Sequence, residues 1–268
     1  IRNIVPISSI DAFVMVNDST GYIKVNKFSA NTYAEFTEAL QRLKDEGSKH
    51  LILDLRDNPG GYLDAATAMA DDFLKGERTV VSTRGRNTAT SEFKSTDGGL
   101  MEDGKLVVLV NESSASASEV VAGAIQDWDR GVIIGRRTYG KGLVQEQYDI
   151  SNGAALRLTT ARYYTPSGRS IQRSFAGGRD EYADDLENRL KDGELTGKEA
   201  RPSDTTKYYT ANHRIVYSGG GIQPDVYVPY DTSRLSDPMY DIAFSDEMRI
   251  AIREFYVHHR SQMQFTTL

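Results

Sequence analysis

The stretch Leu106-Val-Val-Leu-Val-Asn-Glu-Ser-Ser-Ala-Ser-Ala-Ser-Glu119 decides how this chain folds. It opens with five apolar residues, the length of a buried strand, and continues through a short polar loop. The spacing of apolar residues then predicts a helix over 116–128 and a second buried strand over 132–134. A strand, a helix and a second strand in this order are typical of parallel strands in an α/β core.

The same alternation of strands and helices extends toward the N-terminus, whereas strands dominate after residue 135. Thr32 and Glu35 have the spacing of a capping box, which predicts a helix that Gly47 ends. The order predicts an α/β core of parallel strands that is finished by antiparallel strands. The predicted strands are 21–28, 51–55, 79–82, 106–110, 132–134, 143–150 and 155–164, and the predicted helices are 32–47, 64–74 and 116–128.

Two later segments differ from this core. Residues 174–218 are polar and rich in charge, which indicates an insertion or lid with a short helix near 184–191. Asp237-Pro238 is expected to begin a C-terminal helix, because proline is favoured in a first helical turn. We therefore predict a main domain over 1–235 and a C-terminal helical segment over 236–268.

Composition excludes several classes of function. The chain has 268 residues, 39% of them hydrophobic, which is enough for a buried core, and its net charge of −6 disfavours nucleic-acid binding. No apolar run approaches the length of a membrane span. The absence of cysteine excludes disulfides, thiol catalysis and cysteine-ligated zinc. His258-His259 lack the spacing that places two ligands on one helix face, so neither a metal site nor a cofactor is predicted.

Ser116 lies where the strand–loop–helix unit predicts the start of a helix. A serine there would have its hydroxyl beside free backbone N–H groups, which can stabilise an oxyanion. The pair Ser116 and Glu119 also fits a capping box, and taken alone this structural interpretation is favoured. Ser113, Ser114 and Ser118 leave open which serine matters.

A serine nucleophile needs a base, and none of the four histidines lies in a segment that resembles a site. A lysine can replace histidine when burial lowers its pKa from about 10.4. Lys141 stands between two glycines after a buried strand, although a solvated turn is the simpler interpretation. Residues 135–141 also fit GxxxxGK, but a glycine follows where a phosphate loop has Ser or Thr.

The loop Asn58-Pro-Gly-Gly61 lies between a predicted strand and a predicted helix. Its glycines allow a close approach of the backbone to a ligand, so Gly61 can supply a second N–H to an oxyanion hole. An ordinary strand–helix turn explains the loop equally well when it is considered in isolation.

Five stretches in order resolve these alternatives. Together they resemble the catalytic domain of the C-terminal processing proteases, also called tail-specific proteases. The stretches are Leu53-Asp-Leu-Arg-Asp-Asn-Pro-Gly-Gly61, residues 108–124, Gly135-Arg-Arg-Thr-Tyr-Gly-Lys-Gly-Leu-Val-Gln145, Tyr163-Tyr-Thr-Pro-Ser-Gly-Arg-Ser-Ile-Gln172 and Gly220-Gly-Ile-Gln-Pro-Asp-Val226.

The resemblance implies a role for each site residue. Ser116 matches the nucleophile of the family and Lys141 its general base. Gln145 matches the residue that positions the lysine, and the N–H groups of Gly61 and Ala117 match the oxyanion hole. On an unbroken strand, positions 141 and 145 would face the same side.

The resemblance also implies a fold and a reaction. The fold is a crotonase/ClpP-like ββα spiral core, here with additional antiparallel strands and a C-terminal helix. The reaction is that of a serine endopeptidase that cleaves C-terminal regions of proteins through an acyl-enzyme, without a cofactor, in the periplasm or cell envelope. A non-catalytic peptide- or apolar-ligand-binding module on the same fold is the alternative. No PDZ-like stretch is visible, since residues 1–18 are too few for one.

Overall fold

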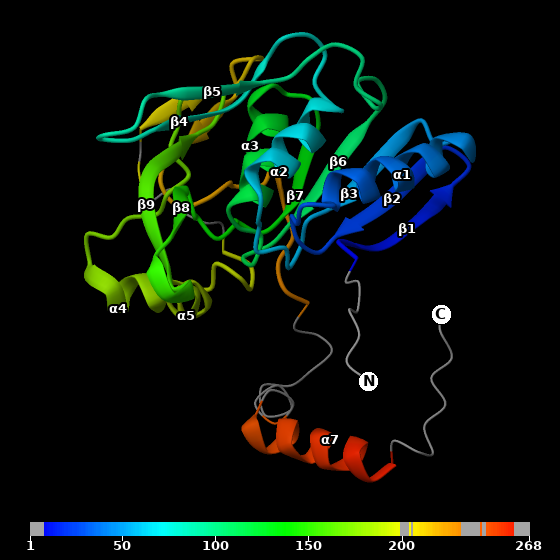
Figure 1. Ribbon diagram of the computed structural model, residues 1–268. Helices are drawn as coiled ribbons and strands as arrows, with labels where there is room; N and C mark the ends of the chain where they lie inside the picture. Colours follow the sequence, from blue (N-terminus) through cyan, green and yellow to red (C-terminus); the bar gives the residue numbers. More distant parts are fainter. Residues whose placement is uncertain (1–7, 199–203, 205, 232–241, 243–244, 260–268) are drawn as a thin grey trace. The chain divides into compact units, whose positions relative to one another are not determined.

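The computed structural model describes residues 8–198, 204, 206–231, 242 and 245–259. The chain divides into two compact units, Ile1–Pro229 and Tyr230–Leu268. The larger unit carries the sheets, and the smaller one carries the helix α7 (Asp246–His259) (Figure 1). A helix is thus confirmed in the C-terminal segment, whereas the predicted start at Asp237-Pro238 lies outside the described residues. The division of functions between the two parts stays a prediction.

A six-stranded sheet forms the centre of the larger unit, with the order β1-β2-β3-β6-β7-β12. β1 runs antiparallel to β2, and the remaining neighbours are parallel. This confirms the α/β core with parallel strands. The strands are β1 (Ile10–Asn17), β2 (Thr20–Val25), β3 (His50–Asp54), β6 (Leu106–Val110), β7 (Val132–Gly135) and β12 (Val226–Tyr227).

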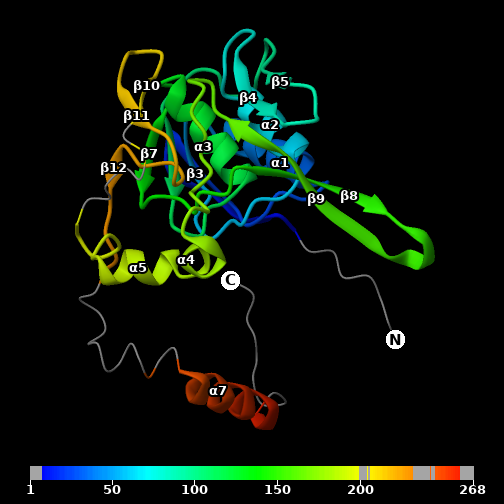
Figure 2. The ribbon, with the colours of Figure 1, turned by 90° about the vertical axis from the view of Figure 1, so that its left-hand side faces the viewer.

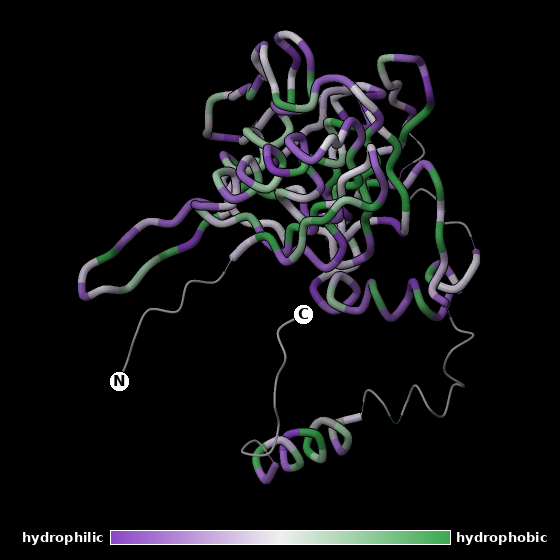
Figure 3. The backbone as a smooth tube through the Cα atoms, turned by 90° about the vertical axis from the view of Figure 1, so that its right-hand side faces the viewer, coloured by the Kyte–Doolittle hydropathy of each residue, from purple (hydrophilic) through white to green (hydrophobic). Residues whose placement is uncertain are grey.

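Three helices connect and cover these strands: α1 (Thr32–Asp45), α2 (Leu63–Asp71) and α3 (Ala117–Asp127). The α3 helix is buried along all of its 11 residues, and it contacts both β7 and β4. A helix enclosed in this way needs small and apolar residues on every face, which explains its sequence Ala-Ser-Glu-Val-Val-Ala-Gly-Ala. Figure 3 shows the hydrophobic segments gathered in the middle of the larger unit.

A second sheet is antiparallel and has the order β5-β4-β9-β8. Its strands are β4 (Thr79–Arg84), β5 (Ser91–Lys94), β8 (Leu143–Asp149) and β9 (Ala155–Tyr164), with the short helix η1 (Ser151–Gly153) between the last two. The predicted antiparallel strands are confirmed. The β8–β9 hairpin extends away from the rest of the unit in Figure 2. β5 was not predicted, because its four residues carry a single apolar side chain.

The polar segment after β9 is more structured than its composition indicates. It contains α4 (Gly178–Ala183) and α5 (Asp185–Lys191), followed by a hairpin of β10 (Lys207–Tyr209) and β11 (Ile215–Tyr217). The short helix that we expected near 184–191 is therefore confirmed as α5. None of the described helices is long and apolar enough to cross a membrane.

The predicted capping box at the start of α1 is wrong. Asn31 is the N-cap residue, so Thr32 is already helical. The Glu35 carboxylate turns away to accept hydrogen bonds from Ser8 Oγ at 2.8 Å and Ser9 N at 2.7 Å. Glu35 therefore holds the chain before β1 instead of capping its own helix.

Candidate active site

Ser116 stands in a strained turn between β6 and α3. It is the N-cap residue of α3, and its backbone has φ 55° and ψ −112°, a conformation that residues other than glycine rarely adopt. Strained backbone of this kind costs about 1–3 kcal/mol and gathers at functional sites. The turn places a half-buried hydroxyl at the end of a parallel strand and the start of a helix.

The serines near Ser116 have structural contacts. Ser114 is fully buried, donates its hydroxyl to Leu55 O at 2.8 Å and accepts Asn111 N at 2.9 Å. Ser118 is also fully buried and donates to Asn58 O at 3.0 Å. Both hydroxyls bind backbone carbonyls of the loop after β3, Ser114 from the serine loop (residues 111–116) and Ser118 from the start of α3. Neither hydroxyl is therefore available as a nucleophile.

The glycine loop, residues 58–61, packs directly against Ser116. A Cβ atom on Gly60 would lie 2.8 Å from both Ser116 Cβ and Ala117 N, so only glycine fits there. Gly61 follows with φ +146°, also a glycine conformation. Within the part of the chain that the structure describes, the N–H groups of Gly61 and Ala117 have no hydrogen-bond partner. The two predicted oxyanion donors thus lie next to the serine turn with their N–H groups unpaired.

Glu119 joins the serine loop to the lysine loop, residues 136–142. Sequence reasoning did not predict this connection. Its side chain is fully buried. Oε2 accepts the N–H groups of Ser116 at 2.9 Å and Lys141 at 2.8 Å. Oε1 accepts Gly140 N at 2.7 Å and Thr138 Oγ1 at 2.5 Å. One carboxylate therefore fixes the distance between the backbones of the two predicted catalytic residues.

The environment of Glu119 contains opposing effects. Burial raises the pKa of the Glu119 carboxyl above its ordinary value, while four hydrogen bonds that favour the charged form oppose this rise. All four partners act as donors, because Thr138 Oγ1 itself accepts Ile222 N at 2.7 Å. No oxygen of the carboxyl is left to carry a proton without losing a hydrogen bond.

The backbone on both sides of Lys141 is fixed by the segment after β9. Gly142 N donates to Gln172 Oε1 at 2.9 Å, and Arg173 N donates to Gly140 O at 3.0 Å. The side chain of Lys141 is half-buried. Across the described ranges, no hydrogen bond joins Ser116 Oγ to Lys141 Nζ. The structure thus brings the two residues into one backbone network without a hydrogen bond between their side chains, within the described residues.

Gln145 lies in a different environment from the one that its spacing indicated. Lys141 precedes β8 by two residues, and the pairing of β8 with β9 is irregular between Val144 and Gln145. The unbroken strand that would place residues 141 and 145 on one side is therefore not present. Gln145 is exposed and makes no hydrogen bond to Lys141 among the described residues. Its role as the residue that positions the lysine stays a prediction.

The same contacts argue against a phosphate loop at residues 135–141. A phosphate loop offers its N–H groups to the ligand. Here the N–H groups of Gly140 and Lys141 already donate to Glu119, an anion of the chain itself. The match to GxxxxGK is therefore a coincidence of sequence.

Comparison with known proteins identifies the family. The model of peptidase family S41 matches residues 19–181, which is more than half of the chain. The chain belongs to peptidase family S41. The matched region of this S41 chain contains Ser116, Lys141 and the glycine loop.

Individual relatives agree with this assignment. A carboxyl-terminal-processing protease of Synechocystis is 44% identical over 155 residues, which cover 58% of this chain and 36% of the relative. A carboxy-terminal-processing protease of Bartonella bacilliformis is 42% identical over 178 residues, 64% of this chain and 40% of the relative. The S41 chain thus spans less than half the length of these two relatives.

Among solved structures, a photosystem II D1 C-terminal processing protease aligns with a TM-score of 0.59 and 27% identity. The alignment covers 91% of this chain and 54% of the other. The fold of the S41 chain is therefore that of a known peptidase, and the predicted resemblance to the C-terminal processing proteases is confirmed.

Proposed function

We propose that this chain is the catalytic part of a serine endopeptidase in which Ser116 is the nucleophile and Lys141 the general base. The observation that carries the proposal is the strained backbone of Ser116 beside two unpaired N–H groups, those of Gly61 and Ala117. Backbone strain of this kind persists at functional sites, and here the strained turn presents a hydroxyl and an oxyanion site together.

The reaction follows from these positions. Lys141, in its neutral form, takes the proton of Ser116, whose Oγ attacks the scissile carbonyl of the substrate. The oxyanion that forms accepts hydrogen bonds from Gly61 N and Ala117 N. Lys141 then passes the proton to the leaving amine, which breaks the peptide bond and leaves an ester on Ser116. A water molecule hydrolyses this ester and regenerates the serine.

The lysine must approach the serine for the first step. The hydrogen-bond reach for a base is about 2.6–3.2 Å, and catalytic contacts without a substrate are often longer. Because the Glu119 bridge already fixes the two backbones, this approach is proposed to take place by a movement of the Lys141 side chain. Gln145 is proposed to hold the amine in this position from β8.

The proposed substrates are proteins, which are cleaved in their C-terminal regions, and the proposed location is the periplasm or cell envelope. The C-terminal preference rests on the names of the carboxyl-terminal-processing relatives, and the location rests on the family resemblance, so neither comes from the site. We further propose that the β strands and helices form a crotonase/ClpP-like spiral of ββα units. The stacking of α2 against α3 and of α1 against α2 supports this arrangement.

The test is hydrolysis of a denatured protein that carries a C-terminal tag. Wild-type chain is compared with Ser116→Ala, Lys141→Ala and Ser113→Ala, the last an exposed serine of the same loop. Ser116→Ala and Lys141→Ala are expected to lose activity by about 10³-fold or more, while Ser113→Ala retains it. Equal cleavage by all four proteins would refute the assignment.

A non-catalytic peptide-binding module is the second candidate. It would account for two observations of the described residues, the missing hydrogen bond between Ser116 Oγ and Lys141 Nζ and the exposure of Gln145. Tagged peptide that binds the wild-type chain without turnover, together with no labelling of Ser116 by a fluorophosphonate, would establish this function instead.

A further inference from the structure

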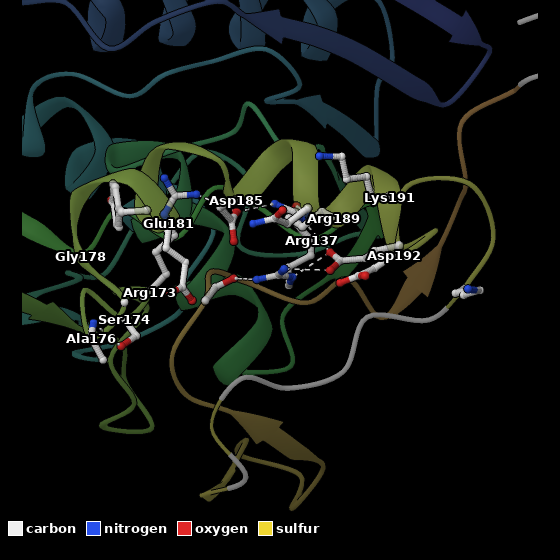
Figure 4. A pocket seen from close by; sticks show the side chains of 16 residues that line it. Arg137, Arg173, Ser174, Ala176, Gly178, Glu181, Asp185, Arg189, Lys191 and Asp192 are labelled. Atoms are coloured by element: carbon white, nitrogen blue, oxygen red, sulfur yellow. Dashed lines mark hydrogen bonds and ion pairs between the residues drawn. The ribbon is translucent and has the colours of Figure 1, made fainter.

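The loop that precedes Lys141 is covered by a segment, residues 174–198, that carries α4 and α5. Between this segment and the core lies a groove of about 1390 Å³, lined largely by charged side chains (Figure 4). Three arginines line this groove. Arg137 belongs to the loop itself, Arg173 directly precedes the segment, and Arg189 lies on α5. The arrangement places a surface segment in direct contact with the support of the proposed base.

Arg189 is the most buried link. Its guanidinium Nη2 donates to Arg137 O at 2.6 Å, and Nη1 donates to Thr138 O at 3.3 Å. These carbonyls precede Lys141 by four and three residues. A guanidinium presents its five donors in a fixed fork, so two contacts to neighbouring carbonyls define the path of the loop.

Glu194 fixes the guanidinium from the other side. It accepts Arg189 Nε at 2.9 Å, and it accepts Arg137 Nε and Nη2 at 2.8 Å each. Burial alone would raise the pKa of Glu194, but the two arginines hold it below its ordinary value. Figure 4 shows Arg137 and Arg189 side by side. The three charged groups form one unit that joins α5 to the loop.

A stack of planar groups makes a second link. The Arg173 guanidinium lies 4.0 Å from the ring centre of Tyr139 and 3.9 Å from that of Tyr182, and Nη1 donates to Asp185 Oδ2 at 2.7 Å. Tyr182 in turn stacks on Phe175 with ring centres 3.9 Å apart. Arg173 thus connects α4 and α5 to Tyr139, two residues before Lys141.

We propose that the α4–α5 segment is a clamp that positions the general base, and that Arg189 is its positioning residue. This rests on the proposed Ser/Lys function. The N–H groups of Thr138, Tyr139 and Gly140 donate to the core and to Glu119, but the carbonyls of Arg137 and Thr138 accept their hydrogen bonds from Arg189 of the clamp. Without Arg189, these two carbonyls lose their donors and the loop relaxes. A displacement of about 1 Å at a catalytic group can cost about 10²-fold in rate.

The first test compares kcat per reactive serine, counted by fluorophosphonate labelling of Ser116, in the full chain. Arg189→Met is expected to lower kcat about 10- to 100-fold with KM within about twofold. Arg189→Lys keeps a charge and donors but not the fork, and it recovers part of the loss. Lys191→Met is the matched control: Lys191 lies on the same helix, its side chain is 66% exposed and it pairs with Glu187, so it should behave as wild type.

A merely structural role for Arg189 would lower the fraction of folded enzyme without changing kcat per labelled serine. That result would overturn the proposal. A rise in KM with unchanged kcat would also overturn it, because it would make the clamp a substrate-binding element.

The second test does not depend on turnover. Hydrogen–deuterium exchange of residues 136–142 is expected to accelerate by about tenfold or more in Arg189→Met and less in Arg189→Lys, because the loop opens more often once its carbonyls lose the Arg189 donors. Unchanged exchange there would overturn the clamp. If the wild-type chain shows no Ser116-dependent hydrolysis, the proposed function fails, yet exchange still decides the clamp. If Arg189→Met does not fold, Arg189→Lys decides both tests.

Discussion

The loop of Ser116 and the loop of Lys141 are held by different kinds of partners. The serine loop is joined to backbone atoms of the core, since Ser114 Oγ donates to Leu55 O and Ala115 N donates to Asn58 O. The lysine loop also has backbone contacts, such as Thr138 N to Ile222 O, but the N–H groups of Gly140, Lys141 and Gly142 donate to side chains from elsewhere in the sequence, those of Glu119 and Gln172. Backbone contacts to the core fix a position, whereas side-chain contacts can be remade.

This difference indicates a division of tasks. The proposed nucleophile and oxyanion donors are preorganised, because their strain is supported by the fully buried helix α3 and by β3. The proposed base is placed by contacts that a substrate or a neighbouring segment can alter. The absence of a hydrogen bond between Ser116 Oγ and Lys141 Nζ, within the described residues, agrees with a base that is adjusted during the reaction.

The largest effect is expected at Glu119, whose carboxylate accepts backbone N–H groups from both loops. Glu119→Gln keeps the size of the side chain but turns one acceptor oxygen into a donor. The new NH2 group then faces two donors where an oxygen accepted them before. These donors are either Ser116 N and Lys141 N, or Gly140 N and Thr138 Oγ1. We expect kcat to fall about 10²-fold, because the distance between the loops is no longer fixed.

The measurement for Glu119→Gln is kcat per folded molecule, with thermal unfolding recorded in parallel. Glu112→Gln is the matched control, since Glu112 is also buried in this loop but pairs with Arg136. If Glu119→Gln keeps the wild-type kcat, the hydrogen bonds of Glu119 do not set the distance between the serine loop and the lysine loop.

A smaller effect, on stability rather than on rate, is expected from Asp54 beneath the serine loop. Its buried carboxylate accepts Tyr22 Oη at 2.7 Å and the Arg56 side chain at 2.6 Å. Burial alone would raise the pKa of Asp54, but these hydrogen bonds hold it below its ordinary value. Burial and Asp54 in turn raise the pKa of Tyr22 to about 12. Asp54→Asn is expected to cost about 1–3 kcal/mol of unfolding free energy near neutral pH.

The pH dependence of this cost has a definite sign. A carboxyl whose pKa is lower in the folded state stabilises the fold above its unfolded pKa, about 3.9 for aspartate, and loses this contribution as the pH falls through the folded value. The difference in unfolding free energy between wild type and Asp54→Asn should thus be constant from pH 5 to 8 and shrink below about pH 4. A difference that grows in acid would contradict the ion pair. Asp18→Asn, at an exposed turn, should show no such difference.

The sequence predicted those parts of the molecule whose cause is local. The apolar run Leu106–Val110, the helix after Ser116 and the glycine loop all follow from residues adjacent in the chain. The clamp and the role of Glu119 could not be predicted, because their partners lie 22 positions away, between Glu119 and Lys141, and 51 positions away, between Thr138 and Arg189.

Gln145 marks the opposite limit. The argument from alternation assumed a regular strand, and the irregular pairing after Val144 leaves no trace in the alternation of side chains. The sequence signal for Glu119 was a charged residue inside an otherwise apolar helix. A capping box with Ser116 already accounted for that charge, so no second role was predicted. Local rules therefore predict the elements, and they fail where a buried polar group serves two distant segments.

No effect on the reactivity of the site is expected at the two structural serines, and this sharpens the choice of nucleophile. Ser118→Ala removes a donor to Asn58 O, which keeps its hydrogen bond from Ala115 N at 3.0 Å, so the cost should be about 1 kcal/mol or less. Ser114→Ala removes both the donor to Leu55 O and the acceptor of Asn111 N, and it should cost about 1–3 kcal/mol. Denaturant unfolding measures both values. Fluorophosphonate labelling per folded molecule should equal that of wild type in both variants, since neither hydroxyl reacts. Loss of labelling in either variant at unchanged stability would move the nucleophile away from Ser116.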